Sequence, residues 1–573
     1  MENRVKILQM TAWGLLALIA LGLIETQLIK GSYFYQLSAN NRIRVVPVEG
    51  KRGRILDRNG VVLVDNRVSF DVLVTPQELK QPDELFLFLS RILGQEPRVL
   101  RKRFQKGSLA PFAPVVIAQD ISREQAFILE ENKFRFPSLL IQESYRRDYL
   151  TRDVGAHVLG YVGKISRSKI ERLKDYGYSA QSIVGYSGVE EYYDQYLKGG
   201  EGGLQIEVNS RGQQVRLLGI RESRQGKDVQ LTIDGEVQRM AYESLEGKRG
   251  AVVVMDVESG EILSLISSPA YDPNIFVDST LEDRISPMFT DPASPSLNRV
   301  IQGLYPPGSV FKIPIAVGAL ETDNAVPSTS YACSGAFKMG RRMIRCSHVH
   351  GTQNLYQAIA HSCNVYFINL GLKLESEIIA KYAKMLGLGQ ATHIDLPFEE
   401  NGSIPSQLTR RMTRNQPWYR GDTANMSIGQ GDVVVTPIQL MRMMAVIARD
   451  GNEIQPFVIK SIGGNEAQIE TTEKVLNIKP ETFMTVKEGM KQTISDEHGT
   501  AHILDMKGLI SYGKTGTAQS SGQKMHHSWF AGYTFSDKRK IAYCVFLEYG
   551  GSSYYAAQVT KNFLQKMQSR ELL

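Results

Sequence analysis

The 573-residue sequence has no internal repeat, no long low-complexity segment and no basic run interleaved with aromatic side chains. Neither sign of charge dominates, because 67 lysines and arginines stand against 60 acidic residues and leave a net charge of +7. These absences exclude repeat architectures and give no footprint for nucleic-acid binding. A chain of this length exceeds what one hydrophobic core supports, so we expect about two to four domains.

Long apolar runs are scarce as well, and the one clear example lies near the N-terminus. Residues 7–24 carry no charge and approach the length that spans a bilayer. A cleaved signal peptide would need a small-residue cleavage site after this run, and residues 25–30 contain none. We therefore expect an uncleaved anchor, with Arg4 and Lys6 keeping the N-terminus in the cytoplasm and the rest of the chain outside.

The composition changes around residues 223–228, and we place a domain boundary there. This predicts three parts: a cytoplasmic tail and transmembrane anchor in residues 1–30, a non-catalytic domain in residues 31–225 and a second domain in residues 226–573.

Within residues 31–225 the local signals are mixed. An Asn-Gly turn at residues 59–60 and the β-branched runs 61–64 and 70–74 predict hairpin structure. Apolar spacing predicts helices over residues 77–105 and 123–133. We expect a mixed α/β domain.

The second domain shows strand patterns at both of its ends and mostly helical patterns between them. The predicted strands are residues 250–256, 262–267, 528–535 and 540–547, and a helix over residues 556–568 follows. Strands that are far apart in sequence with helices between them favour an α+β domain, in which helices cover an antiparallel sheet.

The first chemical motif is Ser309-Val-Phe-Lys312, which follows Pro307-Gly308 where a loop becomes a helix. Ser309 and Lys312 lie one turn apart on the same helix face. A serine hydroxyl becomes a good nucleophile when a base takes its proton, and a buried lysine near a second cation is a workable base. The motif alone is weak, because Ser166 and Lys169 show the same spacing.

Two further motifs follow in order along the chain. Ser362-Cys363-Asn364 lies between predicted helices, and Lys514-Thr515-Gly516-Thr517 lies on a predicted edge strand flanked by glycines. This ordered set of three is typical of penicillin-binding proteins and serine β-lactamases. The chain resembles a class B penicillin-binding protein, most closely the elongation type called penicillin-binding protein 2, over nearly its whole length.

The resemblance implies a β-lactamase/transpeptidase-like domain on an elongated pedestal and a D,D-transpeptidase that cross-links peptidoglycan during cell-wall elongation. It implies that Ser309 attacks the penultimate D-Ala carbonyl of a stem peptide and that Lys312 is the base. Ser362 and Asn364 would relay protons and hold the substrate amide. Lys514 would supply positive charge, while Thr515, Gly516 and Thr517 form the strand that holds the terminal carboxylate.

The same resemblance implies the partners and the location. The partners are stem peptides ending in D-Ala-D-Ala, β-lactams, the membrane, a polytopic membrane glycosyltransferase (RodA-like, of the SEDS family) and other elongation-complex proteins. The catalytic domain would lie on the periplasmic or extracellular side of the cytoplasmic membrane. A division-type transpeptidase, a D,D-carboxypeptidase or penicillin hydrolase, and a scaffold or β-lactam receptor stay open as alternatives.

Three of the four cysteines lie close together, in the pattern Cys333-x12-Cys346-x3-His350-x12-Cys363. This is a ligand set suited to structural zinc, with His348 as a competitor for His350. A Cys333–Cys346 disulfide and three unrelated thiols are the other interpretations. The chemistry itself is expected to need no cofactor.

Overall fold

The computed structural model describes residues 2–34, 43–48, 50–108, 114–178, 182–208, 214–469, 474–520 and 525–573. The chain divides into two compact units that interleave along the sequence. The first unit contains residues 1–52, 66–146 and 198–226, and the second contains residues 53–65, 147–197 and 227–573. Residues 53–65 and 147–197, which were expected in the pedestal, therefore fold with the C-terminal unit. The chain crosses from the first unit to the second for the last time at residues 226–227, close to the expected boundary.

The N-terminal helix α1 spans Glu2–Ile24 and continues into a π-helical turn, Glu25–Ile29. Within the described residues, Asn3–Ile29 is the one helix long and apolar enough to cross a membrane, with a mean hydropathy of 2.1. No residue in the most apolar part of this helix is buried against the rest of the protein, which fits a single-pass membrane anchor.

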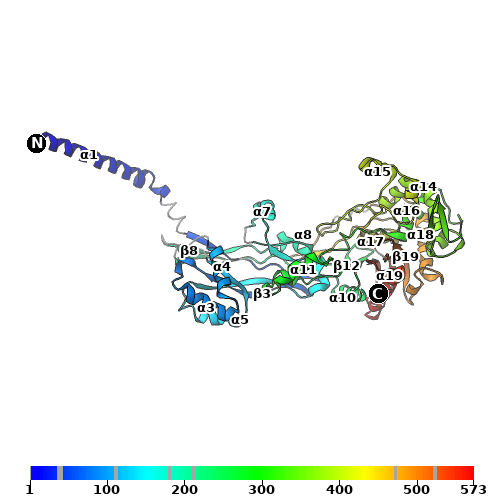
Figure 1. Ribbon diagram of the computed structural model, residues 1–573, viewed down its shortest axis with the longest axis horizontal. Coiled ribbons are helices and arrows are strands. Elements are labelled where there is room, and N and C mark those ends of the chain that lie inside the picture. Colours follow the sequence, from blue (N-terminus) through cyan, green and yellow to red (C-terminus); the bar gives the residue numbers. More distant parts are fainter. Residues whose placement is uncertain are drawn as a thin grey trace. The chain divides into compact units, whose positions relative to one another are not determined.

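Strand β3 (Val62–Val74) pairs antiparallel with β4 (Val115–Ile121) in the first unit. Three helices pack their apolar side chains against these strands in one core: α3 (Pro82–Leu93), α4 (Pro97–Gly107) and α5 (Arg123–Glu131) (Figure 1). A second sheet joins β1 (Ile43–Val48), β8 (Gly202–Val208) and β9 (Gln214–Arg221).

One local prediction for this region was wrong, and a second was confirmed in part. The expected helix over residues 77–105 is two helices, because Gly94 adopts a left-handed conformation (φ 66°) that ends α3. The predicted hairpin is present and joins β3 to β2 (Ile55–Leu56) across the Asn59-Gly60 turn, while the run 70–74 continues the same strand β3. Its turn is fixed by the Asp57 carboxylate, which accepts hydrogen bonds from the N–H groups of Asn59 and Val61.

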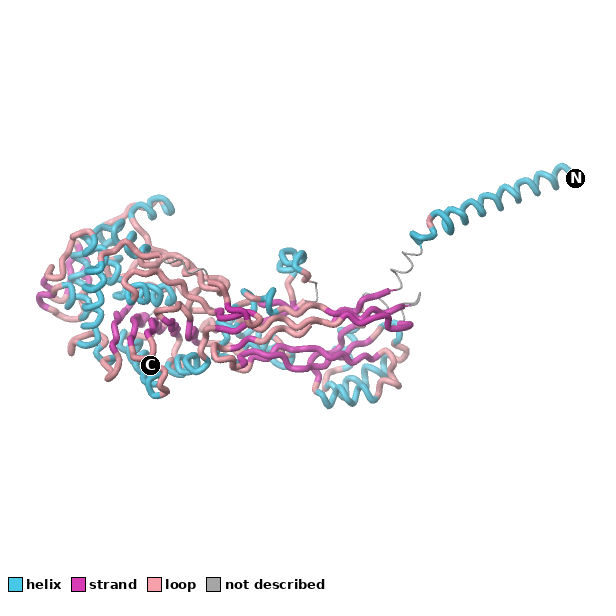
Figure 2. Tube along the Cα trace, turned by 180° about the vertical axis from the view of Figure 1, so that it is seen from behind, coloured by secondary structure: helices cyan, strands magenta, loops and turns pink. Residues whose placement is uncertain are grey.

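The second unit is built on a five-stranded antiparallel sheet in the order β12-β11-β21-β20-β19. Figure 2 shows strands and helices together in the unit that contains the C-terminus. Its strands are β11 (Gly250–Asp256), β12 (Ile262–Ser268), β19 (Ile510–Ala518), β20 (His527–Phe535) and β21 (Lys540–Leu547). The first and last segments of the domain thus form one sheet, as the sequence predicts. Strand β19, which carries Lys514 to Thr517, lies at its edge.

Helices cover both faces of this sheet. Val252 and Val254 lie in one core with α10 (Gly235–Ser244) and α19 (Ser553–Ser569), while Ala251 and Val253 lie in another with α17 (Pro437–Ala448). Alternate residues of β11 thus face opposite layers, so every residue from Gly250 to Met255 is buried. The predicted antiparallel sheet covered by helices is confirmed.

Candidate active site and cysteine cluster

Ser309 lies in a short 3₁₀ turn, Gly308–Phe311, that leads directly into α12 (Lys312–Glu321). Gly308 has φ +56°, and a Cβ added there would lie 2.6 Å from the carbonyl oxygen of Thr517. Only glycine allows both this positive φ and this close approach to Thr517. The backbone beside Ser309 therefore lies against strand β19.

A second glycine holds the same turn from another direction. The carbonyl of Gly429 accepts a hydrogen bond of 3.0 Å from Gly308 N, and a Cβ on Gly429 would lie 2.0 Å from Gly308 O. Gly429 lies in the stretch 427–431, where its φ is +66°. Close backbone packing on two sides fixes the position of the serine turn.

Lys312 is fully buried and bridges the first two motifs. Its Nζ donates to the carbonyl oxygen of Ser362 (2.6 Å), to the Ser362 hydroxyl (3.2 Å) and to Oδ1 of Asn364 (2.7 Å). Burial lowers the pKa of Lys312 to about 8, against the opposing influence of the nearby cysteines 346, 363 and 333. A substantial neutral fraction at physiological pH suits a lysine that takes up a proton.

Lys514 is also fully buried, on the edge strand β19. Its pKa is lowered well below the ordinary value, first by burial and then by the charge of Lys312. Its Nζ donates to the carbonyl of Thr515 at 3.3 Å. Burial and the repulsion between two neighbouring ammonium groups both favour a neutral amine, and a neutral lysine can act as a base.

The two threonines of the third motif have different environments. The Thr517 side chain is exposed, whereas that of Thr515 is only 2% exposed. The Thr515 hydroxyl donates a 2.7 Å hydrogen bond to the hydroxyl of Thr500. Sequence reasoning missed Thr500, because it lies in a loop outside the motifs.

Ser362 lies between α13 (Leu355–Ala360) and α14 (Asn364–Met385). It takes a left-handed backbone conformation, with φ +58°, that non-glycine residues rarely adopt. Cys363 begins α14 by accepting a hydrogen bond from Tyr366 N on its sulfur. This conformation directs both the carbonyl and the hydroxyl of Ser362 at Lys312.

The structure brings the four candidate metal ligands together. The ligand atoms of Cys333, Cys346, His350 and Cys363 all lie within 4.8 Å of one another. Nδ1 of His350 is 3.6 Å from the Cys333 sulfur and 3.4 Å from the Cys346 sulfur, and the sulfurs of Cys346 and Cys363 are 4.0 Å apart. All four cysteines of the chain are free thiols.

This cysteine cluster adjoins the second motif. Asn364 donates its backbone N–H to the Cys346 sulfur (3.1 Å) and its side-chain amide to the carbonyl of Arg345 (2.9 Å). The pKa of the Cys346 thiol is lowered by its hydrogen bond with Cys363 and by backbone N–H groups. Arg345 and Cys346 therefore fix the amide whose oxygen holds Lys312.

Comparison with known proteins matches residues 250–567 to the penicillin binding protein transpeptidase domain and residues 47–231 to the penicillin-binding protein dimerisation domain. The chain belongs to the penicillin-binding protein transpeptidase family. The peptidoglycan D,D-transpeptidase MrdA of Haemophilus influenzae is 30% identical over 94% of this chain and 87% of its own length. The predicted family, fold class and transpeptidase class of enzyme are confirmed.

Two solved structures extend the match. A complex of the penicillin-binding protein PBP2 with MreC from Helicobacter pylori contains a chain that is 28% identical to this one. Its TM-score is 0.82, and the match covers 93% of this chain and all of that one. A peptidoglycan synthase complex described as coordinating polymerization and crosslinking matches at 28% identity and a TM-score of 0.73, over 98% of both chains.

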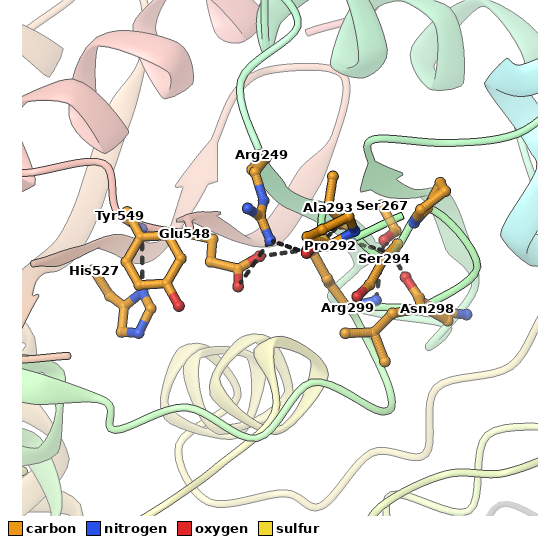
Figure 3. Close-up of polar contacts among 12 residues, drawn as sticks. Arg249, Ser267, Pro292, Ala293, Ser294, Asn298, Arg299, His527, Glu548 and Tyr549 are labelled. Atoms are coloured by element: carbon orange, nitrogen blue, oxygen red, sulfur yellow. Dashed lines mark hydrogen bonds and ion pairs between the residues drawn. The ribbon is translucent and has the colours of Figure 1, made fainter. Parts of the chain in front are cut away.

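In this penicillin-binding protein, a buried ion pair braces the segment that leads to Ser309. Arg299 is fully buried, and its Nε lies 2.8 Å from the carboxylate of Glu548, directly after β21 (Figure 3). Its other nitrogens donate to the carbonyls of Ala293 and Ser294. No sequence motif marked this pair.

The second Ser-x-x-Lys sequence has a local role. Ser166 caps helix α7 (Arg167–Leu173), and Lys169 pairs with Glu191 at 2.9 Å.

The histidines of residues 498–502 are not part of the cysteine cluster, and His502 Nδ1 lies 3.0 Å from the carbonyl of Ile494. Cys544, the fourth cysteine, is buried within β21, which coincides with the predicted strand 540–547.

Proposed function

We propose that this protein cross-links peptidoglycan through an acyl-serine intermediate on Ser309. Lys312 takes the hydroxyl proton, Ser309 Oγ bonds to the carbonyl carbon of the penultimate D-Ala, and the peptide bond to the terminal D-Ala breaks. The terminal D-Ala leaves as a free amine. The observation that carries this proposal is the buried Lys312, one turn after Ser309, with a pKa lowered to about 8.

The other motif residues act around this bond change. Ser362 and Asn364 hold Lys312 and pass protons toward the leaving amine. Burial lowers the pKa of Lys514, but a bound substrate carboxylate favours its protonated form, which then contributes positive charge. Thr515 and Thr517 bind the substrate carboxylate on the edge strand, where Gly516 allows close packing against the serine turn. The N–H groups of Ser309 and Thr517 stabilise the oxyanion.

The second half of the reaction reverses the first with a different amine. An amino group from a neighbouring stem peptide attacks the ester carbonyl, and Lys312 takes the proton that this amine loses. The bond to Ser309 Oγ then breaks as Lys312 passes that proton to the serine oxygen. β-Lactams present a strained amide to the same serine, and the opened ring stays attached. This explains penicillin binding by the same chemistry.

Labelling of the full-length protein in detergent with a tagged penicillin tests the proposal. Peptide mass mapping should place the label on Ser309, and Ser309→Ala should remove it at unchanged abundance. A label on a different residue would contradict the assignment. Product analysis with amine acceptors then separates transpeptidation from hydrolysis by a carboxypeptidase.

We propose further that Cys333, Cys346, His350 and Cys363 hold a structural zinc ion. Zinc with tetrahedral ligands at its usual bond lengths spaces two sulfurs by about 3.8 Å and a sulfur and a nitrogen by about 3.6 Å. The distances of 4.0, 3.6 and 3.4 Å in the cluster match these spacings. Such an ion would brace the loop that carries Asn364 and take no part in the bond changes.

We propose that residues 3–29 anchor the protein with its N-terminus in the cytoplasm. Arg4 and Lys6 precede the apolar core of this helix, as positive residues do on the cytoplasmic side. Protease added to spheroplasts should then digest the catalytic unit, whereas the opposite orientation would protect it.

We propose a polytopic membrane glycosyltransferase as the partner that supplies glycan strands. The two matched domains span most of the chain, and neither is a glycan polymerase. A structural relative belongs to a complex that couples polymerization to crosslinking. Crosslinking of the full-length chain in its membrane should capture such a protein; capture of a protein without glycan-polymerising activity would contradict it.

A further inference from the structure

Thr500 connects the third motif to the helix that precedes the second. Its hydroxyl accepts a 2.7 Å hydrogen bond from the hydroxyl of Thr515 and donates one of 3.3 Å to the carbonyl of Ala360. Ala360 is the last residue of α13, two positions before Ser362. A chain of two hydroxyls thus runs from the edge strand to the loop that holds Lys312.

The Ala360 carbonyl has a second donor, because the backbone N–H of Thr500 also bonds to it at 3.2 Å. The Thr500 hydroxyl is therefore free to turn away without leaving a buried carbonyl unpaired. Each hydroxyl carries one proton and can accept further hydrogen bonds. The direction of the Thr515–Thr500 bond can thus reverse at little cost.

We propose that Thr500 is a positioning residue for the substrate carboxylate, acting through Thr515; this inference rests on the proposed function. When a carboxylate lies beside Thr515, the Thr515 hydroxyl donates its hydrogen bond to that carboxylate, because hydrogen bonds to an ionised acceptor are stronger than those to a neutral one. The Thr500 hydroxyl then turns to donate to the Thr515 oxygen. The two bonds polarise each other and hold the Thr515 hydroxyl toward the substrate.

The loop around Thr500 is rigid enough for this role. A Cβ on Gly499 would lie 2.4 Å from the carbonyl of Thr493, so the chain passes tightly against the end of α18 (Pro480–Ser495). Ala501 N donates to the same carbonyl at 3.0 Å, and His498 N donates to the carboxylate of Asp496 at 2.7 Å. Thr500 is held on both sides, and its side chain is partly exposed.

A purely structural role makes a different prediction. If Thr500 only ties its loop to α13, the loss of its hydroxyl affects all substrates alike, because the backbone bond to Ala360 remains. If it directs the Thr515 hydroxyl, the loss depends on the charge of the group that Thr515 binds. The two roles separate on a pair of probes that differ in that charge alone.

The experiment uses the full-length protein in detergent and two thioester substrates. One leaving group ends in a carboxylate, and its matched partner ends in a carboxamide. The variants are Thr500→Val, Thr500→Ser and the control Thr493→Val, which removes a fully buried hydroxyl bonded to the Gly489 carbonyl in α18. The readout is kcat/KM for each probe, with kcat and KM resolved.

We expect Thr500→Val to lower kcat/KM about tenfold for the carboxylate probe, mainly through KM, and to leave the carboxamide probe within about twofold. Thr500→Ser should restore the wild-type ratio, and Thr493→Val should keep it. If the valine variant does not fold, Thr500→Ala gives the same comparison.

Equal losses on both probes, or no loss on either, would overturn the inference and leave the acyl-serine mechanism standing. Absence of an adduct on Ser309 in the wild-type protein would overturn the mechanism and the inference with it. The two failures are therefore distinguishable in one set of measurements.

Discussion

Nζ of Lys312 lies 2.7 Å from Oδ1 of Asn364, so the first and second motifs share one buried amine. The amide nitrogen of the same Asn364 donates to the carbonyl of Arg345, and its backbone N–H to the sulfur of Cys346. The position of Lys312 is thus set by residues 345–346, through Asn364, as well as by its own helix.

Replacement of Lys312 by methionine should lower the rate of penicillin acylation about 10²- to 10⁴-fold, because general-base catalysis contributes that much. A time course of tagged penicillin binding to the full-length protein, quenched at intervals and read on a gel, measures this rate. Lys381→Met, at an exposed position on α14, is the matched control and should acylate normally. A Lys312→Met variant within threefold of wild type would assign the base elsewhere.

The acylation rate should rise with pH. Burial lowers the Lys312 pKa to about 8, so its neutral, proton-accepting form grows as pH increases through that value and saturates above it. Acylation rates measured between about pH 6 and 9.5 should therefore show one inflection near 8. A rate that falls across this range would mean that a protonated group limits the reaction.

Loss of one cysteine from the cluster should remove the metal. Cys333→Ser is expected to reduce bound zinc from about one equivalent to near zero, measured by elemental analysis of purified protein, and to lower Tm. Cys544→Ala is the control, since Cys544 is equally buried but lies in β21 outside the cluster. Zinc retained in Cys333→Ser, or absent from the wild type, would contradict the ligand assignment.

Glu548→Ala should destabilise the protein by about 3–5 kcal/mol, because it leaves the buried Arg299 without its carboxylate. Glu258→Ala removes an exposed pair with Lys540 and should cost at most about 1 kcal/mol. Denaturant unfolding of the two variants compares them directly. Equal costs would mean that Arg299 finds another partner.

Much of the catalytic unit followed from local sequence. The apolar runs on both sides of the 257–260 turn indicated adjacent strands, and the glycines around Lys514 indicated an edge strand, because these signals act over a few residues. The three motifs could be placed on a helix start, an interhelical loop and a strand for the same reason.

The contacts between these elements were beyond such reasoning. Thr515 meets Thr500 and Arg299 meets Glu548 only after distant segments pack together, and neither pair has a periodic or spacing signature. The prediction of one helix over residues 77–105 was wrong for a local reason. The apolar pattern continues past Gly94, but the left-handed conformation of Gly94 ends the helix there.

The central sheet has a consequence for how the protein matures. Val252 of β11 pairs with Val545 of β21, so the middle of the sheet closes only after almost the entire chain is available. Strand β19, with Lys514, reaches β11 only through β20 and β21. Because a chain is synthesised from its N-terminus, the three motifs come together last, and the proposed acylation of Ser309 requires the whole chain.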